Sequence, residues 1–231
     1  TDDKNDPTEA ANAGAKLIDM DRVVAIIGSV SSKCSSPLSD KCQVSRIPMV
    51  TPTSTNPKVT VDEQGRRKDY VFRACFIDPF QGTVGARFAL DSLKARTAAV
   101  MFDVGNDYSK GLADFFRAAF EQGGGRVTAF ESYAKDDVDY SALLTKVKQA
   151  GPDVLFIPDY YNKVSLIAKQ AKEKCINVPM DAGHGWDSPD LYIEAVDGGF
   201  FTNHYSAEDP RPEVQAFVAA YKAKFGEVPD A

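Results

Sequence analysis

The chain has 231 residues, 43% of them hydrophobic, and its 27 basic and 33 acidic side chains give a formal net charge of -6. This length suits one large domain or two small ones. Because acidic and basic residues are mixed throughout, no basic stripe is present for a phosphate backbone, and we exclude nucleic acid as a partner. No apolar run approaches the roughly 20 residues that span a bilayer. The first residues, TDDKNDP, do not resemble a signal peptide, so we expect a cytosolic protein or one whose leader was removed.

The N-terminal part alternates helical and strand patterns. Asp6, Pro7 and Glu9 supply an N-cap, a first-turn proline and a capping-box glutamate, which predict a helix over residues 7–20. The apolar run at residues 23–27, bounded by charge and a glycine, is typical of a strand covered on both faces. A helix and two short strands are predicted next, at residues 35–44, 48–50 and 70–73.

From Asp78 the same alternation continues to the end of the chain. Helices are predicted at residues 80–93, 109–122, 140–150, 163–174, 189–196 and 212–225. Strands are predicted at residues 98–102, 127–130, 154–157, 178–180 and 200–202. Strands that alternate with helices of about 10 to 15 residues indicate βαβ units, so we expect an α/β fold with parallel sheets.

The four cysteines form no CxxC pair, and no histidine lies at metal-ligand spacing from them, so we expect no metal site. Cys34 and Cys42 can be bridged only if the chain bends between them. Eight residues of straight helix rise about 12 Å, beyond the roughly 7 Å Cα separation that a disulfide allows. Both a bridge and buried free thiols stay open.

Polar and aromatic residues follow five of the predicted strands. In open parallel sheets the ligand crevice lies outside the carboxyl ends of the strands. The segments at these ends are GSVSS from Gly28, TPTST from Thr51, residues 103–108, PDYY from Pro158 and DAGHGW from Asp181. Their hydroxyl groups, aromatic rings and glycines predict one polar pocket with aromatic walls.

Six segments carry a resemblance that extends over essentially the whole chain. In order, they read IIGSVSS, MVTPTSTNPKVT, FRACFIDPFQG, FDVGNDYSKGLADFF, GPDVLFIPDYYN and GWDSPDL. Together they resemble the type I periplasmic solute-binding proteins, and among these the branched-chain amino-acid (Leu/Ile/Val) binding group that serves ABC importers. The resemblance implies two Rossmann-like or flavodoxin-like lobes with parallel sheets, joined by a hinge and closing on a ligand between them.

The resemblance also implies how the chain is divided. Residues 1–73 would belong to the first lobe, 74–202 to the second, and 203–231 to a segment that returns toward the first, with hinge strands near residues 74–75 and 202–203. Relatives begin with a further strand and helix and continue beyond FGEVPDA, so we expect a fragment or a sequence that omits both ends. A parallel sheet without its central strand would leave two rows of unpaired backbone groups.

The first-lobe ligand contacts are expected in the two hydroxyl-rich loops. The resemblance implies that Ser32, Thr53 and Thr55 bind the carboxylate and amino groups of the ligand, with Ser31 as a further candidate. Small residues expose backbone N–H groups and a helix N-terminus favours an anion, and Ser32 is expected just before a helix. In the alternative, Ser32 or Ser35 caps that helix and Thr55 sets an Asn-Pro turn.

Two tyrosines are the expected contacts across the cleft. Tyr108 and Tyr160 match the family positions whose rings and hydroxyls close over the ligand, although Tyr161 competes with Tyr160 for that role. Trp186 and Asp187 are expected to fix their loop and to cap the following helix. Trp186 could also flank the pocket.

The loop DAGHGWDSP departs from the family pattern, since His184 stands where relatives that bind amino acids carry an acid for the ligand ammonium. A neutral imidazole can accept a hydrogen bond but supplies no countercharge, and a protonated one would repel an ammonium. Asp181 or Asp159 is a candidate for the missing carboxylate. Otherwise His184 favours a ligand without a free amine, such as an organic acid, an aromatic carboxylate or an amide. In the alternative, His184 has only a structural role in its loop.

The function implied by the resemblance is capture of an amino acid or a related carboxylate or amide, and its delivery to the membrane permease of an ABC importer. The receptor is expected to be a monomer without a cofactor, in the periplasm or lipid-anchored on the outer face of the bacterial membrane. The alternative is a ligand-sensing regulatory domain of a receptor or transcriptional regulator with the same fold. No GxSxG, Walker or HExxH motif is present, so we expect no enzyme.

Overall fold

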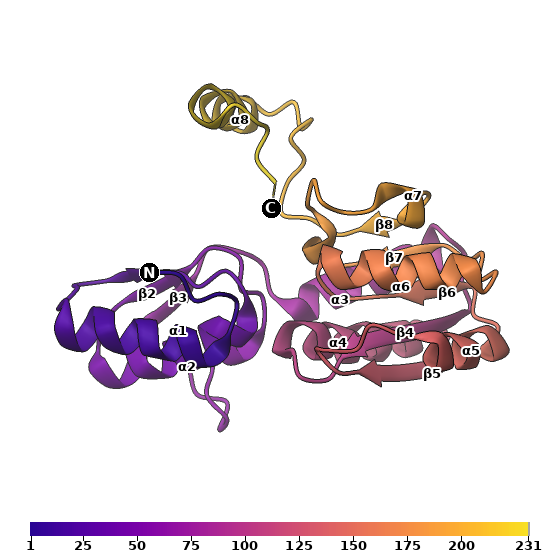
Figure 1. Ribbon diagram of the computed structural model, residues 1–231, viewed down its shortest axis with the longest axis horizontal. Helices are drawn as coiled ribbons and strands as arrows, with labels where there is room; N and C mark the ends of the chain where they lie inside the picture. The colour runs from indigo at the N-terminus through magenta and orange to yellow at the C-terminus, as the bar shows by residue number, and fades with distance from the viewer. Residues whose placement is uncertain (231) are drawn as a thin grey trace.

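The computed structural model describes residues 1–230 and has two α/β bodies that lie side by side (Figure 1). We call the body around the three-stranded sheet the first lobe and the body around the five-stranded sheet the second lobe. Every strand pair within both sheets is parallel. The predicted α/β class with two parallel sheets is therefore confirmed.

The first lobe is small and holds its strands in chain order. Its elements are α1 (Pro7–Ala15), which a π-helical turn (Lys16–Met20) continues, β1 (Ile26–Ile27), α2 (Ser32–Ser45), β2 (Met49–Thr51) and β3 (Val71–Arg73). Ile26 pairs with Met49, and Met49 in turn pairs with Val71. These three side chains are buried with Leu38 and Cys42 of α2 in one hydrophobic cluster, which holds α2 against the sheet.

The second lobe is a doubly wound sheet. Its elements are α3 (Asp78–Asp91), β4 (Thr97–Asp103), α4 (Asp107–Gln122), β5 (Arg126–Tyr133), α5 (Ser141–Ala150), β6 (Val154–Phe156), α6 (Tyr161–Glu173), β7 (Met180–Ala182), α7 (Ile193–Val196) and β8 (Phe200–Phe201). One core cluster joins α3 and α4 to the sheet, and a second joins α5, α6 and α7 to it. Helices therefore cover both of its faces.

The strand order β5-β4-β6-β7-β8 fixes where a ligand crevice can form. The chain passes from β4 to β5 on one side and then to β6 on the other, so the order reverses between β4 and β6. In doubly wound sheets the crevice lies at this switch point, beyond the carboxyl ends of the strands. Tyr108 follows β4 and Tyr160 follows β6, which puts both tyrosines there.

Helix α2 begins three residues earlier than the predicted helix over residues 35–44. The backbone N–H groups of Cys34 and Ser35 donate to the Ser31 carbonyl at 3.1 and 2.9 Å, which makes Ser31 the N-cap. The expectation that Ser32 precedes this helix is therefore wrong, because Ser32 is its first residue. The alternative in which Ser32 or Ser35 caps the helix is wrong for the same reason.

Three other predicted elements differ from the structure. The strand predicted at residues 23–27 is only β1, and Ile27 is 87% exposed at the edge of the sheet, so it is not covered on both faces. The strand predicted at residues 178–180 lies two residues later, because Met180 pairs with Leu155 and Asp181 with Phe200. The helix predicted at residues 189–196 is reduced to α7, so Asp187 does not cap it.

The last helix, α8 (Pro212–Phe225), has the predicted bounds and lies apart from both lobes in Figure 1, with none of its residues buried. Its return toward the first lobe stays a prediction, as do the lobe boundaries at residues 73 and 202. None of the helices described in residues 1–230 has the length and apolar character needed to cross a bilayer.

Cys34 and Cys42 both lie on α2 as buried free thiols. The bend that a disulfide between them requires is absent, because both belong to the same helix. Of the two open readings, the structure therefore shows the free thiols.

Candidate functional site

A cavity of about 310 Å³ lies between the lobes, at the carboxyl ends of their strands. We call it the inter-lobe cavity. All six residues predicted as ligand contacts line it, and they are Ser32, Thr53, Thr55, Tyr108, Tyr160 and His184. The competing Tyr161 also lines it. The structure thus brings the predicted residues of both lobes together, and their contact with a ligand stays a prediction.

The first-lobe wall consists of the two hydroxyl loops and the start of α2. Ser32 is buried, and its Oγ accepts a hydrogen bond from the Asn56 backbone N–H at 3.2 Å. The Thr53 hydroxyl donates to the Val30 carbonyl at 2.9 Å. Thr55 is completely buried, and its hydroxyl has no hydrogen-bond partner within residues 1–230. A buried hydroxyl without a partner costs free energy, and the buried Asp78 carboxyl, on which this hydroxyl acts, also lacks one in the described chain.

The N-terminus of α2 opens on the same side. The Ser31 hydroxyl donates to Asn5 Oδ1 at 2.7 Å instead of capping the helix, and no other side chain in the described part of the protein caps it. Free N–H groups and the helix dipole make such an end favourable for an anion. The polar end of this wall therefore suits a carboxylate.

Two stacked tyrosines form the second-lobe wall. The rings of Tyr108 and Tyr160 lie 5.4 Å apart between centroids at an interplanar angle of 28°. The Tyr108 hydroxyl accepts a hydrogen bond from the Gly185 backbone N–H at 3.2 Å, which ties the wall to the loop after β7. Burial raises the pKa of both phenols, so both hydroxyls stay protonated and can donate or accept.

His184 is the most unusual part of the lining. Its Nδ1 lies 3.1 Å from Gln81 Oε1, its ring meets Tyr108 edge-on at 5.0 Å, and the His204 ring lies 4.7 Å away. Burial, with the neighbouring His204, lowers the pKa of His184 to about 3. Its imidazole is therefore neutral near pH 7.

Of the further candidates, Ser31 and Asp159 line a neighbouring cavity of about 580 Å³, which we call the outer cavity. Asp159 accepts hydrogen bonds from the Tyr133 hydroxyl at 2.6 Å and from the Tyr160 N–H at 2.7 Å. Trp186 lines neither cavity, since it is buried in the second-lobe core and donates from Nε1 to the Ile157 carbonyl at 3.1 Å.

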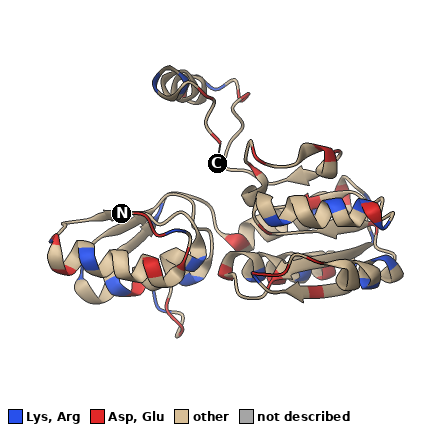
Figure 2. Ribbon diagram, in the orientation of Figure 1, with Lys and Arg blue, Asp and Glu red and all other residues tan. Residues whose placement is uncertain are grey.

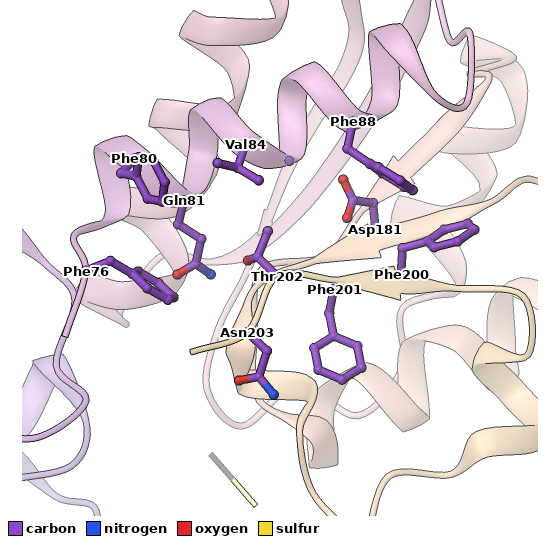
Figure 3. A pocket seen from close by; sticks show the side chains of 11 residues that line it. Phe76, Phe80, Gln81, Val84, Phe88, Asp181, Phe200, Phe201, Thr202 and Asn203 are labelled. Atoms are coloured by element: carbon purple, nitrogen blue, oxygen red, sulfur yellow. The ribbon is translucent and has the colours of Figure 1, made fainter. Parts of the chain in front are cut away.

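Asp181 lies in a third place, an apolar groove of about 340 Å³ between α3 and β8 (Figure 3). Phenylalanines dominate this groove, and the figure shows Asp181 between Phe88 and Phe200. One carboxyl oxygen of Asp181 accepts from the Ala182 N–H at 2.9 Å, and the other is buried without a partner in the described chain. Neither Asp181 nor Asp159 therefore supplies a carboxylate to the inter-lobe cavity.

Burial raises the pKa of Asp181 to about 8. A carboxyl whose pKa is raised by folding contributes stability at low pH and loses it as the pH rises through its folded pKa. We expect Asp181→Asn to gain about 1–3 kcal/mol of unfolding free energy relative to the natural protein between pH 5 and pH 9. Urea denaturation at the two pH values measures this. The exposed Asp190→Asn is the control, and an equal gain in both variants would contradict the buried-acid account.

Sequence reasoning missed the residues behind the cavity wall. Phe76 stacks on His204 at 4.4 Å, and His204 contacts His184, while Gln81 bonds to His184 from α3. Phe76 and Gln81 both belong to the segment FRACFIDPFQG, which carried the family resemblance without indicating these contacts. Asp78, in the same segment, is fully buried. Burial raises its pKa to about 7, although the Thr55 hydroxyl and the Arg73 guanidinium both act to lower it.

Charges are distributed without strong segregation on the outside of both lobes. Figure 2 shows acidic and basic residues interspersed along the helices. A phosphate backbone needs a continuous basic surface, and the absence of a nucleic-acid partner stays a prediction.

Three bacterial binding proteins illustrate what this chain is similar to. Leu/Ile/Val-binding protein homolog 3 of Brucella melitensis is 31% identical over 226 residues, which make up 96% of this chain and 60% of that protein. The solved leucine binding protein LivK of Thermotoga maritima is 42% identical with a TM-score of 0.92, and the match covers 99% of this chain and 65% of that one. The substrate-binding protein LivJ of Streptococcus pneumoniae, solved with isoleucine, is 28% identical with a TM-score of 0.87, over 99% of this chain and 65% of that one.

The chain thus spans about 60% of the length of the curated relative. A family model described as periplasmic binding protein matches residues 1–231. The resemblance predicted from the six segments is therefore confirmed, and this chain belongs to the periplasmic binding protein family.

Proposed function

We propose that this chain is the ligand-binding part of an extracytoplasmic solute receptor, which captures an amino acid or a related carboxylate or amide and delivers it to an ABC importer. The observation that carries the proposal is the inter-lobe cavity, in which three polar side chains from the first lobe face two tyrosines and a histidine from the second. A pocket with convergent polar groups and aromatic walls binds small molecules well. The receptor is non-catalytic and acts in the periplasm or tethered outside the membrane.

The carboxylate of the ligand binds at the first lobe. There the uncapped start of α2, the Ser32 hydroxyl and the unpartnered Thr55 hydroxyl converge on one side of the cavity. Hydrogen bonds to a charged group are stronger than those between neutral groups, so these donors anchor the ligand and orient it. The ligand's remaining surface lies against the Tyr108 and Tyr160 rings, which cover apolar groups while their hydroxyls stay available.

Closure of the lobes completes the site. The lobes already meet beside the cavity, where the Asn56 side chain donates to the Asp107 carbonyl at 2.6 Å and Lys58 pairs with the Asp107 carboxylate at 3.0 Å. A ligand that touches both walls stabilises the closed form by its differential affinity, with the hinge at residues 74–75 and 202–203. The permease then distinguishes the closed receptor from the open one.

The relatives support the importer assignment. LivJ of Streptococcus pneumoniae is a branched-chain amino acid transporter substrate-binding protein and was solved with isoleucine, and it shares the fold over 99% of this chain. The Brucella melitensis relative is named a Leu/Ile/Val-binding protein homolog. Import of a small carboxylate is the function that fits both these relatives and the polar wall of the cavity.

The Thr55 hydroxyl gives a direct test. Thr55→Val removes a buried hydroxyl that has no partner in the described protein, so we expect unchanged or slightly raised thermal stability. The affinity for a carboxylate ligand should fall by about tenfold or more, because a hydrogen bond to a charged group is lost. Thermal unfolding measures the stability, and calorimetric titration of the whole gene product measures the affinity, with ligands first found by a thermal-shift screen of amino acids and carboxylates.

Thr51→Val is the matched control. The Thr51 hydroxyl donates to the Ser29 carbonyl at 2.7 Å and does not line the inter-lobe cavity, so its loss should lower stability and leave affinity nearly unchanged. X-ray scattering should also show compaction at saturating ligand. If Thr55→Val bound ligand as tightly as the natural protein and scattering showed no compaction, the proposed site and its mechanism would be wrong.

A further inference from the structure

The environment of His184 defines part of the second-lobe wall of the inter-lobe cavity. Gln81 Oε1 lies 3.1 Å from Nδ1 and, as an amide oxygen, can only accept, so this orientation of Gln81 assigns the proton to Nδ1 and leaves Nε2 as a neutral acceptor. The Tyr108 and His204 rings pack against the imidazole. A second imidazole at 4.7 Å would repel a charged His184, which keeps both rings neutral.

A buried carboxylate is missing from the lining of this cavity. Three aspartates line it within the described residues, and none of them is fully buried. Asp187 is half-buried and already accepts a hydrogen bond from the Asn203 side chain at 2.7 Å, whereas Asp190 and Asp230 are exposed. Exposed charges interact weakly with a buried group because water screens them. An ammonium placed beside His184 would lose hydration and would meet a neutral imidazole instead of an anion on that side, which is unfavourable.

The adjoining outer cavity also favours an anion. It shares Tyr160 and Tyr161 with the inter-lobe cavity. Four lysines line it, two from each lobe, at positions Lys4, Lys33, Lys135 and Lys163. Three aspartates, Asp3, Asp103 and Asp159, line it as well, and each of them accepts a hydrogen bond within the described residues. Lysines gathered at the mouth of a cleft raise the local concentration of negatively charged ligands.

We propose that the receptor's ligand is a small carboxylate without a free ammonium, which presents a neutral hydrogen-bond donor, a hydroxyl or an amide N–H, to Nε2 of His184. The inference rests on the proposed function and names the ligand class of the same site. The depressed pKa of His184, caused by burial and by His204, agrees with an imidazole that stays neutral throughout the physiological range. The neutral acceptor then discriminates against zwitterions, because a neutral donor satisfies it without a buried unpaired charge.

Matched ligands of one carbon skeleton test the proposal. We would titrate the whole gene product with leucine, 2-hydroxy-4-methylpentanoate and N-acetyl-leucine, and with phenylalanine, phenyllactate and N-acetyl-phenylalanine. The hydroxy or N-acyl acid of at least one skeleton is expected to bind at least tenfold more tightly than its amino acid. Equal or tighter binding of the amino acid in the series that binds overturns this inference and leaves the proposed function intact. Absence of binding by all six compounds overturns both.

Two variants make the role of His184 specific. His184→Glu supplies the missing countercharge, so the preference should move toward the amino acid by at least tenfold. His184→Gln keeps a neutral acceptor and should retain the natural preference, which a merely structural histidine would not require. If His184→Glu does not fold, the affinity of the natural protein for the hydroxy or N-acyl acid, relative to its affinity for the amino acid, still tests the proposed ligand class. A folded His184→Glu variant in which the relative affinities for the matched ligands are unchanged would show that His184 does not set the ligand class.

Discussion

Trp186→Ala is expected to lower the free energy of unfolding by about 3–5 kcal/mol, the loss found when a large buried aromatic side chain is truncated. Trp186 is 1% exposed, and its Nε1 donates to the Ile157 carbonyl at 3.1 Å, so both its bulk and its hydrogen bond are used. The side chain holds the turn that contains His184 and Gly185 against the end of β6. Urea denaturation measures the loss, and weaker ligand binding should accompany it because the turn lines the inter-lobe cavity.

Two comparisons separate the causes of that loss. Trp186→Phe keeps most of the apolar volume and removes only the hydrogen bond, so about 0.5–1.5 kcal/mol should be lost. Phe201→Ala truncates a neighbouring ring that is 39% exposed and lies 6.4 Å from Trp186, and its cost should be clearly smaller than that of Trp186→Ala. If Trp186→Ala cost no more than Phe201→Ala, the turn would be held by something other than the indole.

The strand-end rule predicted the segments that surround the inter-lobe cavity, and the family resemblance selected the residues within them. Tyr108 and Tyr160 lie far apart in the sequence, yet each follows a predicted strand, and the carboxyl ends of parallel strands meet at one edge. The hydroxyl loops around Ser32 and Thr55 obey the same rule in the first lobe. The rule works because it depends on the alternation of strands and helices, which hydrophobic patterns reveal, and not on exact element boundaries.

The exact boundaries of helices and strands were harder to predict, because backbone hydrogen bonds decide them and residue types alone do not determine these bonds. The Ser31 carbonyl accepts from two N–H groups and starts α2 at Ser32, although Ser35 and Pro37 look like a later start. Asp181 belongs to β7 because its backbone pairs with Phe200, whereas its charge argues against a central strand position. The energetic conflict is reduced by a pKa raised to about 8, which keeps the buried carboxyl protonated near neutral pH.

The residues behind the wall of the inter-lobe cavity could not be predicted from the sequence. His204 reaches His184 from the segment that follows β8, and Phe76 reaches His204 from the segment that precedes α3. No local pattern relates three rings on three separate segments. Both supporting rings lie next to residues 74–75 and 202–203, which are the proposed hinge strands.

Gly183→Ala is expected to weaken ligand binding by about tenfold or more and to lower the unfolding free energy by about 1–3 kcal/mol. A β-carbon at residue 183 would overlap Gln81 Nε2 and Tyr108 Oη, and it would lie 2.7 Å from Leu112 Cδ2. Gln81 and Tyr108 are buried and cannot move aside freely. Their displacement breaks the bonds that orient His184 and Gly185, so affinity should fall more than stability alone explains.

The matched control for Gly183→Ala is Gly105→Ala, in the loop after β4, where a β-carbon would meet only Asp103 Oδ1 at 3.4 Å. This substitution should leave affinity and stability nearly unchanged, because 3.4 Å is close to ordinary van der Waals contact. Calorimetric titration with the best ligand of the matched series, followed by urea denaturation of the same samples, measures both effects. Tight binding by a folded Gly183→Ala variant would mean that Tyr108 and Gln81 do not shape the cavity, and the positions assigned to the second-lobe wall would have to be revised.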